Sequence, residues 1–399
     1  MQGFFSSENV LPQPAYSTLA SGLAAPRCEP LKPSAPSPAP RDGLADITTQ
    51  MQNLFLAPLP AQQPPPRQAF VLSPEPTPEM LTALFGPRAR TPPAVLPPAS
   101  QPAARRALLG PPDEDIDAGD AGEPIFCSAF VEEVYDGLRA REAVDTVDPE
   151  YMQRVQPPGS GVTARTRALL VNWMMEVCLK FKLASETLYL SVALVDRYLA
   201  RRAARRDTLQ LLGITAMFVA AKFEEIYPPL LDDFVYISAD TYTADEIIVC
   251  ERDLLAAVQW NLTPPFSLFF LRRFSKACGC DALLHTMGKY LLEHALLSVA
   301  MLRYAPSLQA AAAVYLARVL LGVPGPAWPR TVRHYSAYTE AEVLPCAQTL
   351  VELVTTSDPK LRFVVQKYSS PKLGSVARTA ALSAVAAAEI LQQRLLAIQ

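Results

Sequence analysis

The sequence predicts an all-α protein with two tandem five-helix bundles, preceded by a short helix and a disordered N-terminal tail. Three observations carry this prediction. Apolar residues recur at helical spacing from Ile125 onward, and a row of small residues returns roughly 100 residues after its first occurrence. The first segment, by contrast, is dominated by proline. No run of alternating polar and apolar residues predicts a strand.

The first 123 residues have a composition that cannot build a packed core. They hold 24 of the chain's 39 prolines, including Gln-Gln-Pro-Pro-Pro at residues 62–66. Such a segment buries too little apolar surface to offset the entropy lost on ordering. We therefore expect residues 1–123 to be a disordered regulatory tail. Its four Ser/Thr-Pro steps are either phosphorylation sites or chance products of the composition: Ser37, Ser73, Thr77 and Thr91.

Residues 124–265 are expected to form the first bundle together with the short helix that precedes it. Phe130 and Val134 recur at helical spacing and predict this short amphipathic helix. Longer apolar periodicities predict helices over residues 163–181 and 188–199. The bundle therefore begins with two consecutive helices that each have one apolar face.

A central helix of the first bundle is predicted by its small residues. Gly213, Ala216 and Ala220 form an i, i+3, i+7 row, and small side chains on such a row let neighbouring helices approach closely. Asp207 is expected to open this helix, because its spacing to Gln210 resembles a capping box.

A second bundle is predicted because the same features recur in order. Small residues return at 310–313, and a Thr-x-x-Glu capping box occurs at 243–246 and again at 339–342. We expect residues 266–375 to form this second bundle and residues 376–399 to form a helical C-terminal tail.

Charge, hydropathy and cysteine usage exclude several classes of protein. The net charge of -3 and a pI near 5.8 give no basic field for non-specific nucleic-acid binding. Arg318 interrupts the most apolar stretch, residues 310–323, before it reaches the roughly 20 residues of a membrane span. The first basic residue is Arg27, so no secretory signal is predicted. Seven scattered cysteines indicate reduced thiols, and we expect a nuclear and/or cytoplasmic protein.

The sequence lacks the groups that catalysis would need. Its three histidines, His285, His294 and His334, have no partner at zinc-binding spacing. No phosphate-binding glycine loop is present, and Cys278 and Cys280 are too close to form a CxxC pair. We therefore predict a protein that is not an enzyme and that uses no metal or cofactor.

Three stretches are more specific than periodicity. They are Thr-Arg-Ala-Leu-Leu-Val-Asn-Trp at 166–173, Ala-Ala-Lys-Phe-Glu-Glu-Ile-Tyr-Pro-Pro at 220–229, and Asp-Thr-Tyr-Thr at 240–243. Together they resemble the cyclin box of the mitotic A/B-type cyclins, and the resemblance covers about residues 124–375. It implies a fold of two cyclin-box bundles.

Two further stretches resemble the B-type members of that family. These are Phe-Phe-Leu-Arg-Arg-Phe-Ser-Lys at 269–276 and His-Tyr-Ser-Ala-Tyr-Thr-Glu at 334–340. The resemblance implies a regulatory subunit that binds and activates a mitotic cyclin-dependent Ser/Thr kinase. It also implies that the protein helps to select substrates and controls G2/M progression, while the catalytic groups belong to the kinase.

The resemblance also implies which residues contact the kinase. Lys222 and Glu251 match positions that hydrogen-bond the kinase segment leading into its αC helix. Pairing of Lys222 with the two glutamates that follow it is the alternative. The other implied contacts are apolar, with core packing as their alternative role: Phe223, Val219, Leu255, Trp260, Leu262, Phe130 and Val134.

A second set of residues resembles the family's substrate-docking groove, which binds Arg-x-Leu motifs. Core packing is again the alternative role of these side chains. Thr166 and Asn172 depart from the family pattern at the groove edge. Arg167 and Asp196 match a buried ion pair with a structural role. The implied groove residues are Leu169, Leu170, Trp173, Glu176 and Gln210.

The tail contains a resemblance to the family's destruction box, RxxLxxI. Arg41, Leu44 and Ile47 occupy its three defining positions, which implies recognition by the ubiquitin ligase of mitotic exit. Lys32 is the only lysine before Lys180, so it is the only nearby side-chain acceptor for ubiquitin.

Two other functions compete with kinase activation. A cyclin-fold adaptor in the transcription machinery would be expected to have a basic face and an N-terminal zinc ribbon, and the sequence has neither. A helical enzyme would need a nucleophile and a base, which are also missing.

Overall fold

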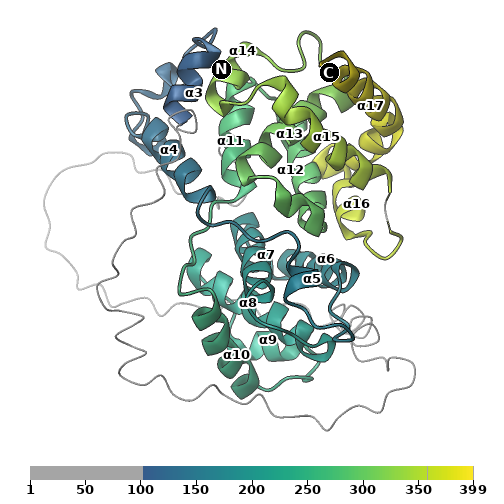
Figure 1. Cartoon of the computed structure of the whole chain (residues 1–399). Coiled ribbons are helices and arrows are strands. Elements are labelled where there is room, and N and C mark those ends of the chain that lie inside the picture. Colours follow the sequence, from purple (N-terminus) through teal and green to yellow (C-terminus); the bar gives the residue numbers. More distant parts are fainter. Residues whose placement is uncertain (1–101, 357, 399) are drawn as a thin grey trace, which may run out of the picture. The chain divides into compact units, whose positions relative to one another are not determined.

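The computed structural model describes residues 102–356 and 358–398, and every regular element in these ranges is a helix (Figure 1). The predicted all-α class with two tandem domains is confirmed. None of the helices in the described ranges is long and apolar enough to cross a membrane. The destruction-box-like residues and Lys32 lie outside the described residues.

An ordered N-terminal segment is attached to the second bundle through charged contacts. Asp117 binds both Arg273, with two contacts of 2.6 Å, and Lys276, at 2.7 Å. The expectation of disorder is therefore wrong for residues 102–123, because composition does not reveal ion pairs between distant segments. The elements here are α3 (Pro102–Leu109), η2 (Ala118–Asp120), η3 (Pro124–Phe126) and α4 (Val131–Glu142).

Helix α8 is the central helix of the first bundle and packs against α6, α7 and α10. Ala216 and Ala220 are completely buried, and a Cβ atom at Gly213 would lie 2.7 Å from Leu170 Cδ1. The small-residue row thus permits the predicted close approach. The helices are α5 (Tyr151–Arg154), α6 (Ala164–Phe181), α7 (Ser185–Leu199), α8 (Leu209–Glu224), α9 (Leu231–Ile237) and α10 (Ala244–Ala257).

The start of α8 differs from the prediction. A 3-10 turn, η4 (Arg206–Thr208), precedes it, and Thr208 occupies the N-cap without a capping hydrogen bond, because its hydroxyl donates to the Arg205 carbonyl at 3.1 Å. Asp207 instead pairs with Arg205 at 2.6 Å, while Gln210 is completely buried. The predicted capping box is therefore wrong. Spacing alone does not distinguish a capping side chain from one that is turned into the core.

Helix α13 is the corresponding central helix of the second bundle, between α11, α12 and α15 (Figure 1). Residues 310–313 are completely buried, and both predicted capping boxes, at 243–246 and 339–342, are formed. The helices are α11 (Ser267–Ala277), α12 (Ala282–Leu296), η5 (Val299–Arg303), α13 (Pro306–Leu320), α14 (Arg330–Ser336) and α15 (Glu340–Thr355).

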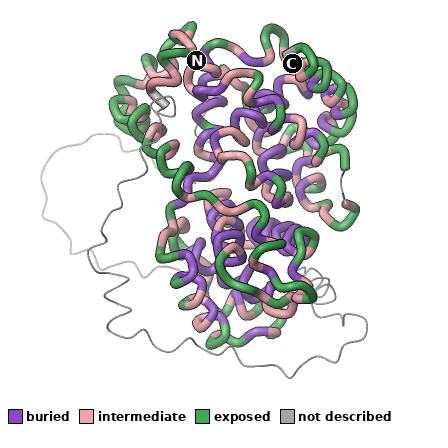
Figure 2. Tube along the Cα trace, viewed as in Figure 1, coloured by how far each residue is buried: buried purple, intermediate pink, exposed green. Residues whose placement is uncertain are grey.

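The C-terminal segment packs on the second bundle. After α16 (Phe363–Tyr368) and η6 (Pro371–Leu373), helix α17 (Val376–Ile398) lies along α15 and α13. Its buried face is a row at helical spacing, whereas its other side is exposed (Figure 2). The expected tail is thus an additional helix of this bundle. The buried row consists of Ala380, Ala384, Ala387 and Leu391.

Candidate partner-binding site

Lys222 and Glu251 lie next to each other on two helices of the first bundle. Lys222, in the last turn of α8, donates a hydrogen bond to Glu251 Oε1 on α10. The Lys222 ammonium also lies 3.9 Å from the centre of the Phe218 ring. An ammonium has three donor protons and a carboxylate has several acceptor positions. Both groups therefore keep hydrogen-bonding capacity for a partner.

The alternative pairing of Lys222 with the glutamates that follow it is not formed. Glu225 Oε1 instead accepts hydrogen bonds from the backbone N of Ala184, at 2.7 Å, and from the Thr187 hydroxyl. These donors lie at the start of α7, where a negative charge is stabilised by the helix dipole. Glu225 therefore has a structural role that the sequence did not predict.

The apolar contact candidates near this pair divide into two groups. Phe223 and Trp260 are 47 % and 57 % exposed. Val219 and Leu255 are buried in the core of the first bundle, and Leu262 is partly buried against it. The structure thus gives Val219 and Leu255 a packing role, while Phe223 and Trp260 remain available to a partner.

Sequence reasoning missed three more exposed apolar residues in the link between α8 and α9. Ile226, Tyr227 and Leu230 are 88 %, 81 % and 72 % exposed. The sequence could have indicated them, because they lie next to Pro228-Pro229. Prolines cannot continue a helix, so residues beside them have no helical face that packs against the core. We use the name α8–α10 face for Lys222, Phe223, Ile226, Tyr227, Leu230, Glu251 and Trp260.

The last two apolar candidates are Phe130, the N-cap of α4, and Val134 within the helix. Phe130 and Val134 are exposed, whereas neighbouring side chains fix the helix. The Tyr135 hydroxyl donates to the Phe269 carbonyl at 3.0 Å, and Arg141 donates to Thr263. The helix is therefore held in position by residues other than the two that it leaves uncovered.

Arg167 and Asp196 form a buried, bidentate ion pair between α6 and α7. Their contacts measure 2.9 Å (Nε to Oδ1) and 2.6 Å (Nη2 to Oδ2), and Tyr151 donates to the same carboxylate at 2.8 Å. Burial and the adjacent Asp196 charge raise the pKa of Tyr151 well above its usual value. Arg167 also donates to the Leu296 carbonyl, so the pair ties the first bundle to the second.

The docking candidates lie together but are mostly enclosed. Leu169, Leu170, Trp173 and Gln210 are buried, whereas Glu176 is partly exposed. Within the described ranges, Trp173 Nε1 and both amide atoms of Gln210 have no hydrogen-bond partner. Leaving a buried amide unsatisfied typically costs about 1–3 kcal/mol. These three atoms are therefore the unusual feature of the site.

Asn172 makes two side-chain hydrogen bonds at the edge of the predicted groove. Its Nδ2 donates to Glu176 Oε1 at 2.9 Å, and its Oδ1 accepts from the Phe363 backbone N at 3.2 Å. A carboxylate could not make both contacts, because it has no donor. Burial raises the pKa of Glu176 despite this hydrogen bond.

The titratable groups of the described residues do not assemble into a metal centre. No three His, Cys, Asp or Glu side chains in these ranges lie close enough to hold an ion. Burial lowers the pKa of His294 to about 4, so it remains neutral beside Tyr290. His285 and His334 form hydrogen bonds of 2.9 Å with Ser275 and 2.8 Å with the Gly110 carbonyl.

Comparisons with family models match both bundles. The model of the N-terminal cyclin domain matches residues 133–263, and that of the C-terminal cyclin domain matches residues 265–382. Among solved structures, the viral cyclin of herpesvirus saimiri has a TM-score of 0.49 and 22 % identity. The aligned region covers 55 % of this chain and 96 % of the viral cyclin.

Curated proteins show a closer relationship. The G2/mitotic-specific cyclin-B of Dictyostelium discoideum is 42 % identical over 265 residues, which are 66 % of this chain and 60 % of that protein. The G2/mitotic-specific cyclin-B of Arbacia punctulata is 40 % identical over 283 residues, 70 % of this chain and 68 % of that protein. The match thus spans less than two thirds of the Dictyostelium protein.

Proposed function

This chain belongs to the cyclin family and is most similar to the mitotic B-type cyclins, and from this membership we propose that it binds and activates a mitotic cyclin-dependent Ser/Thr kinase. In this role it is a regulatory subunit that acts at the G2/M transition. It functions in the nucleus, the cytoplasm or both, and the catalytic groups are those of the kinase.

The α8–α10 face is the observation that supports kinase binding most strongly. Three of its apolar residues, Ile226, Tyr227 and Leu230, are among the most exposed large apolar side chains of the described residues, and they closely follow Lys222 along the chain. Clustered exposed apolar side chains beside polar groups are typical of protein interfaces. The apolar residues supply buried area, while the charged pair supplies directional hydrogen bonds.

Activation is a shift between kinase conformations. Phosphoryl transfer requires the kinase's strand lysine and αC glutamate to be paired, and its activation loop to be correctly placed. A rigid surface that binds only this arrangement increases its population by the difference in affinity for the two states. The packed helices α8 and α10, joined by Lys222 and Glu251, provide such a surface.

A pull-down of the full chain from dividing cells, followed by mass spectrometry, tests this proposal. We expect a cyclin-dependent kinase at near-stoichiometric amount. Recovery of polymerase or general transcription factors in its place would support the adaptor function, and recovery of no stoichiometric kinase would contradict the proposal.

Substrate selection is the second part of the proposed function. An extended Arg-x-Leu peptide offers backbone donors and acceptors. Trp173 Nε1 and the Gln210 amide are buried atoms that would gain such partners. Glu176 supplies a carboxylate to attract the arginine. The unpartnered polar atoms are the observation that supports docking at this site.

Replacing Gln210 with methionine separates docking from packing. We expect KM for Arg-x-Leu substrates to rise about tenfold, because one or more hydrogen bonds to the peptide are lost. Folding stability should be unchanged or higher, since an unsatisfied buried amide is removed. Steady-state phosphorylation of matched peptides with and without the motif provides the measurement. An equal change for both peptides would mean that Gln210 serves only the core.

Timed destruction through the tail is the third part. Arg41, Leu44 and Ile47 would bind the ubiquitin ligase as an extended peptide, with Leu44 in an apolar pocket. We expect Arg41→Ala/Leu44→Ala to lengthen the half-life at mitotic exit several-fold, measured against the parent and Lys32→Arg. Decay of the double variant at the parent rate would remove the box from the proposal. Normal decay of Lys32→Arg would place the ubiquitin acceptor elsewhere.

A further inference from the structure

The link between α11 and α12 holds two cysteines in a tight turn. Helix α11 ends at Ala277, Cys278 is its C-cap, and Gly279 adopts a left-handed conformation with φ of +60°. The backbone N of Cys280 then bonds the Ser275 carbonyl at 2.9 Å. This is the glycine-dependent closure common at helix C-termini. Cys278 and Cys280 therefore lie on either side of Gly279 in one turn of the second bundle.

The two thiols are free and partly exposed, and each affects the pKa of the other. Residues separated by one position in such a turn have Cα atoms about 5–6 Å apart, within the roughly 4.4–6.8 Å that disulfides span. This Cα spacing is compatible with a disulfide across Gly279.

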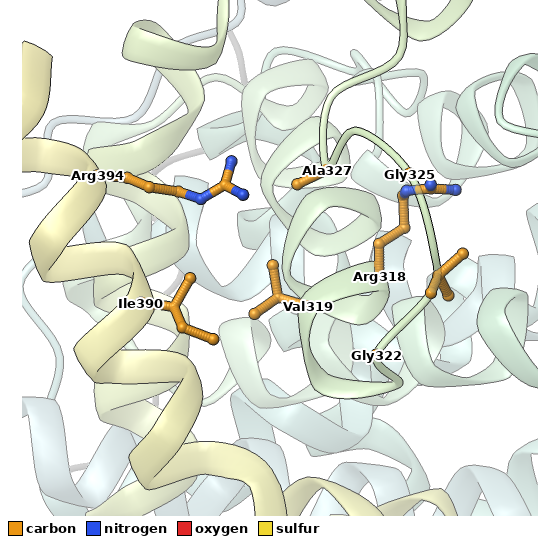
Figure 3. A pocket seen from close by; sticks show the side chains of 8 residues that line it. Arg318, Val319, Gly322, Gly325, Ala327, Ile390 and Arg394 are labelled. Atoms are coloured by element: carbon orange, nitrogen blue, oxygen red, sulfur yellow. The ribbon is translucent and has the colours of Figure 1, made fainter.

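Arg318 on α13 supplies a positive charge at this turn. Its Nη1 lies 3.4 Å from Cys278 Sγ, and its Nη2 bonds the carbonyls of Pro324, at 3.3 Å, and Pro326, at 3.1 Å. The side chain is buried and lines a pocket, where it points away from Arg394 and toward the loop at Gly325 (Figure 3). The guanidinium is therefore held in place beside the sulfur.

These contacts give the two thiols different acidities. The hydrogen bond from Cys280 and the charge of Arg318 lower the pKa of Cys278 to about 7, against the effect of burial. Donation to Cys278 and burial both raise the pKa of Cys280. The position of the Arg318 guanidinium, 3.4 Å from the Cys278 sulfur, therefore favours Cys278 as the thiolate of the pair. A reactive thiolate beside a second thiol is the usual arrangement of peroxide-sensitive cysteines.

We propose that Cys278 and Cys280 form an oxidation site for hydroperoxides that closes as an intramolecular disulfide. The Cys278 thiolate attacks the peroxide, an S–O bond forms, the O–O bond breaks, and the departing oxygen takes up a proton as water or an alcohol. Cys280 then attacks the sulfenic sulfur, and its proton leaves with the hydroxide as water. Two thiols are oxidised by two electrons and one peroxide is reduced.

The other described cysteines lack this arrangement. Cys127 is exposed, and its thiol contacts only the Pro124 carbonyl among the hydrogen bonds of the described residues. Burial raises the pKa of the remaining three, which opposes formation of a thiolate. They are Cys178, Cys250 and Cys346. Cys127 is therefore the internal control: its thiol is accessible to peroxide but has no hydrogen bond to an arginine or a second thiol within the described ranges.

Treatment of the full-length chain with hydrogen peroxide at pH 7, followed by alkylation and peptide mass spectrometry, tests the proposal. Trypsin releases both cysteines in the single peptide of residues 277–289. We expect this peptide to lose two hydrogen atoms about tenfold faster than Cys127 is oxidised, since the thiolate is the reactive form. A thiol reductant should restore it. Oxidation no faster than that of Cys127 would overturn the proposal.

Cysteine-to-serine variants test which thiol attacks the peroxide and which one resolves the sulfenic acid. They leave the buried Arg318 unchanged. Cys280→Ser should accumulate a sulfenic acid at Cys278 that reacts with a 1,3-dicarbonyl probe, because the resolving thiol is missing. Cys278→Ser should leave Cys280 as unreactive as Cys127. Trapping of sulfenic acid at Cys280 in that variant, or its absence at Cys278 in the first, would contradict the assigned order. Circular dichroism checks that both variants remain folded.

Discussion

The charge-exchanged double variant Lys222→Glu/Glu251→Lys is expected to fold like the parent protein but to lose kinase affinity by at least about a hundredfold. Lys222 and Glu251 bond each other, so exchanging them preserves their attraction within the chain. A partner that binds both groups meets reversed charges. Removing one member of a buried charge pair at an interface costs about 2–5 kcal/mol.

Affinity capture and calorimetric titration with the purified kinase provide the measurement, with thermal melting as the folding check. The matched control is the exchange Arg205→Asp/Asp207→Arg before α8, where an exposed pair is joined at 2.6 Å. Neither residue belongs to the α8–α10 face, so the control should bind the kinase normally. Parent-like affinity of the Lys222/Glu251 exchange would remove this pair from the interface.

Asp196→Ala is expected to lower the free energy of unfolding by about 3–5 kcal/mol, the usual effect of removing one member of a buried ion pair. The substitution leaves the Arg167 guanidinium buried without its carboxylate, and Tyr151 also loses its acceptor. Because Arg167 binds the Leu296 carbonyl, we expect contacts between the two bundles to weaken as well. Urea unfolding followed by circular dichroism measures the loss.

The control for this prediction is Asp207→Ala, which removes the partner of Arg205 from an exposed pair. Exposed ion pairs contribute about 0–1 kcal/mol, so little change is expected. If Asp196→Ala were as mild as Asp207→Ala, the buried pair would not hold the first bundle together.

Local chemistry explains why most of the fold could be predicted from the sequence. The capping boxes at 243–246 and 339–342 and the small-residue rows of α8 and α13 depend on residues within a few positions of each other. The spacing of these residues alone predicts where the helices begin and that α8 and α13 lie at the centres of their bundles. The segment at 102–123 depends on ion pairs such as Asp117 with Arg273, and composition cannot reveal such distant partners.

The candidate site was only partly predictable for the same reason. The family resemblance identified Lys222 and Glu251 as a functional pair, but only the packing of α8 against α10 shows that they bond each other. Helical spacing did not separate Val219, which is buried, from Phe223, which is exposed. The exposed link residues Ile226 and Tyr227 required knowledge of where α8 ends.

The most direct test of the central claim is the phosphorylation rate of a purified mitotic cyclin-dependent kinase as the full chain is added. We predict that the rate rises by about a hundredfold, as expected when a conformation populated at roughly 1 % becomes dominant. It should saturate at one chain per kinase and respond little to the Lys222/Glu251 exchange variant at the same concentration. A rate that stays at the level of the kinase alone, with the parent chain present in excess, would contradict the proposal that this protein activates such a kinase.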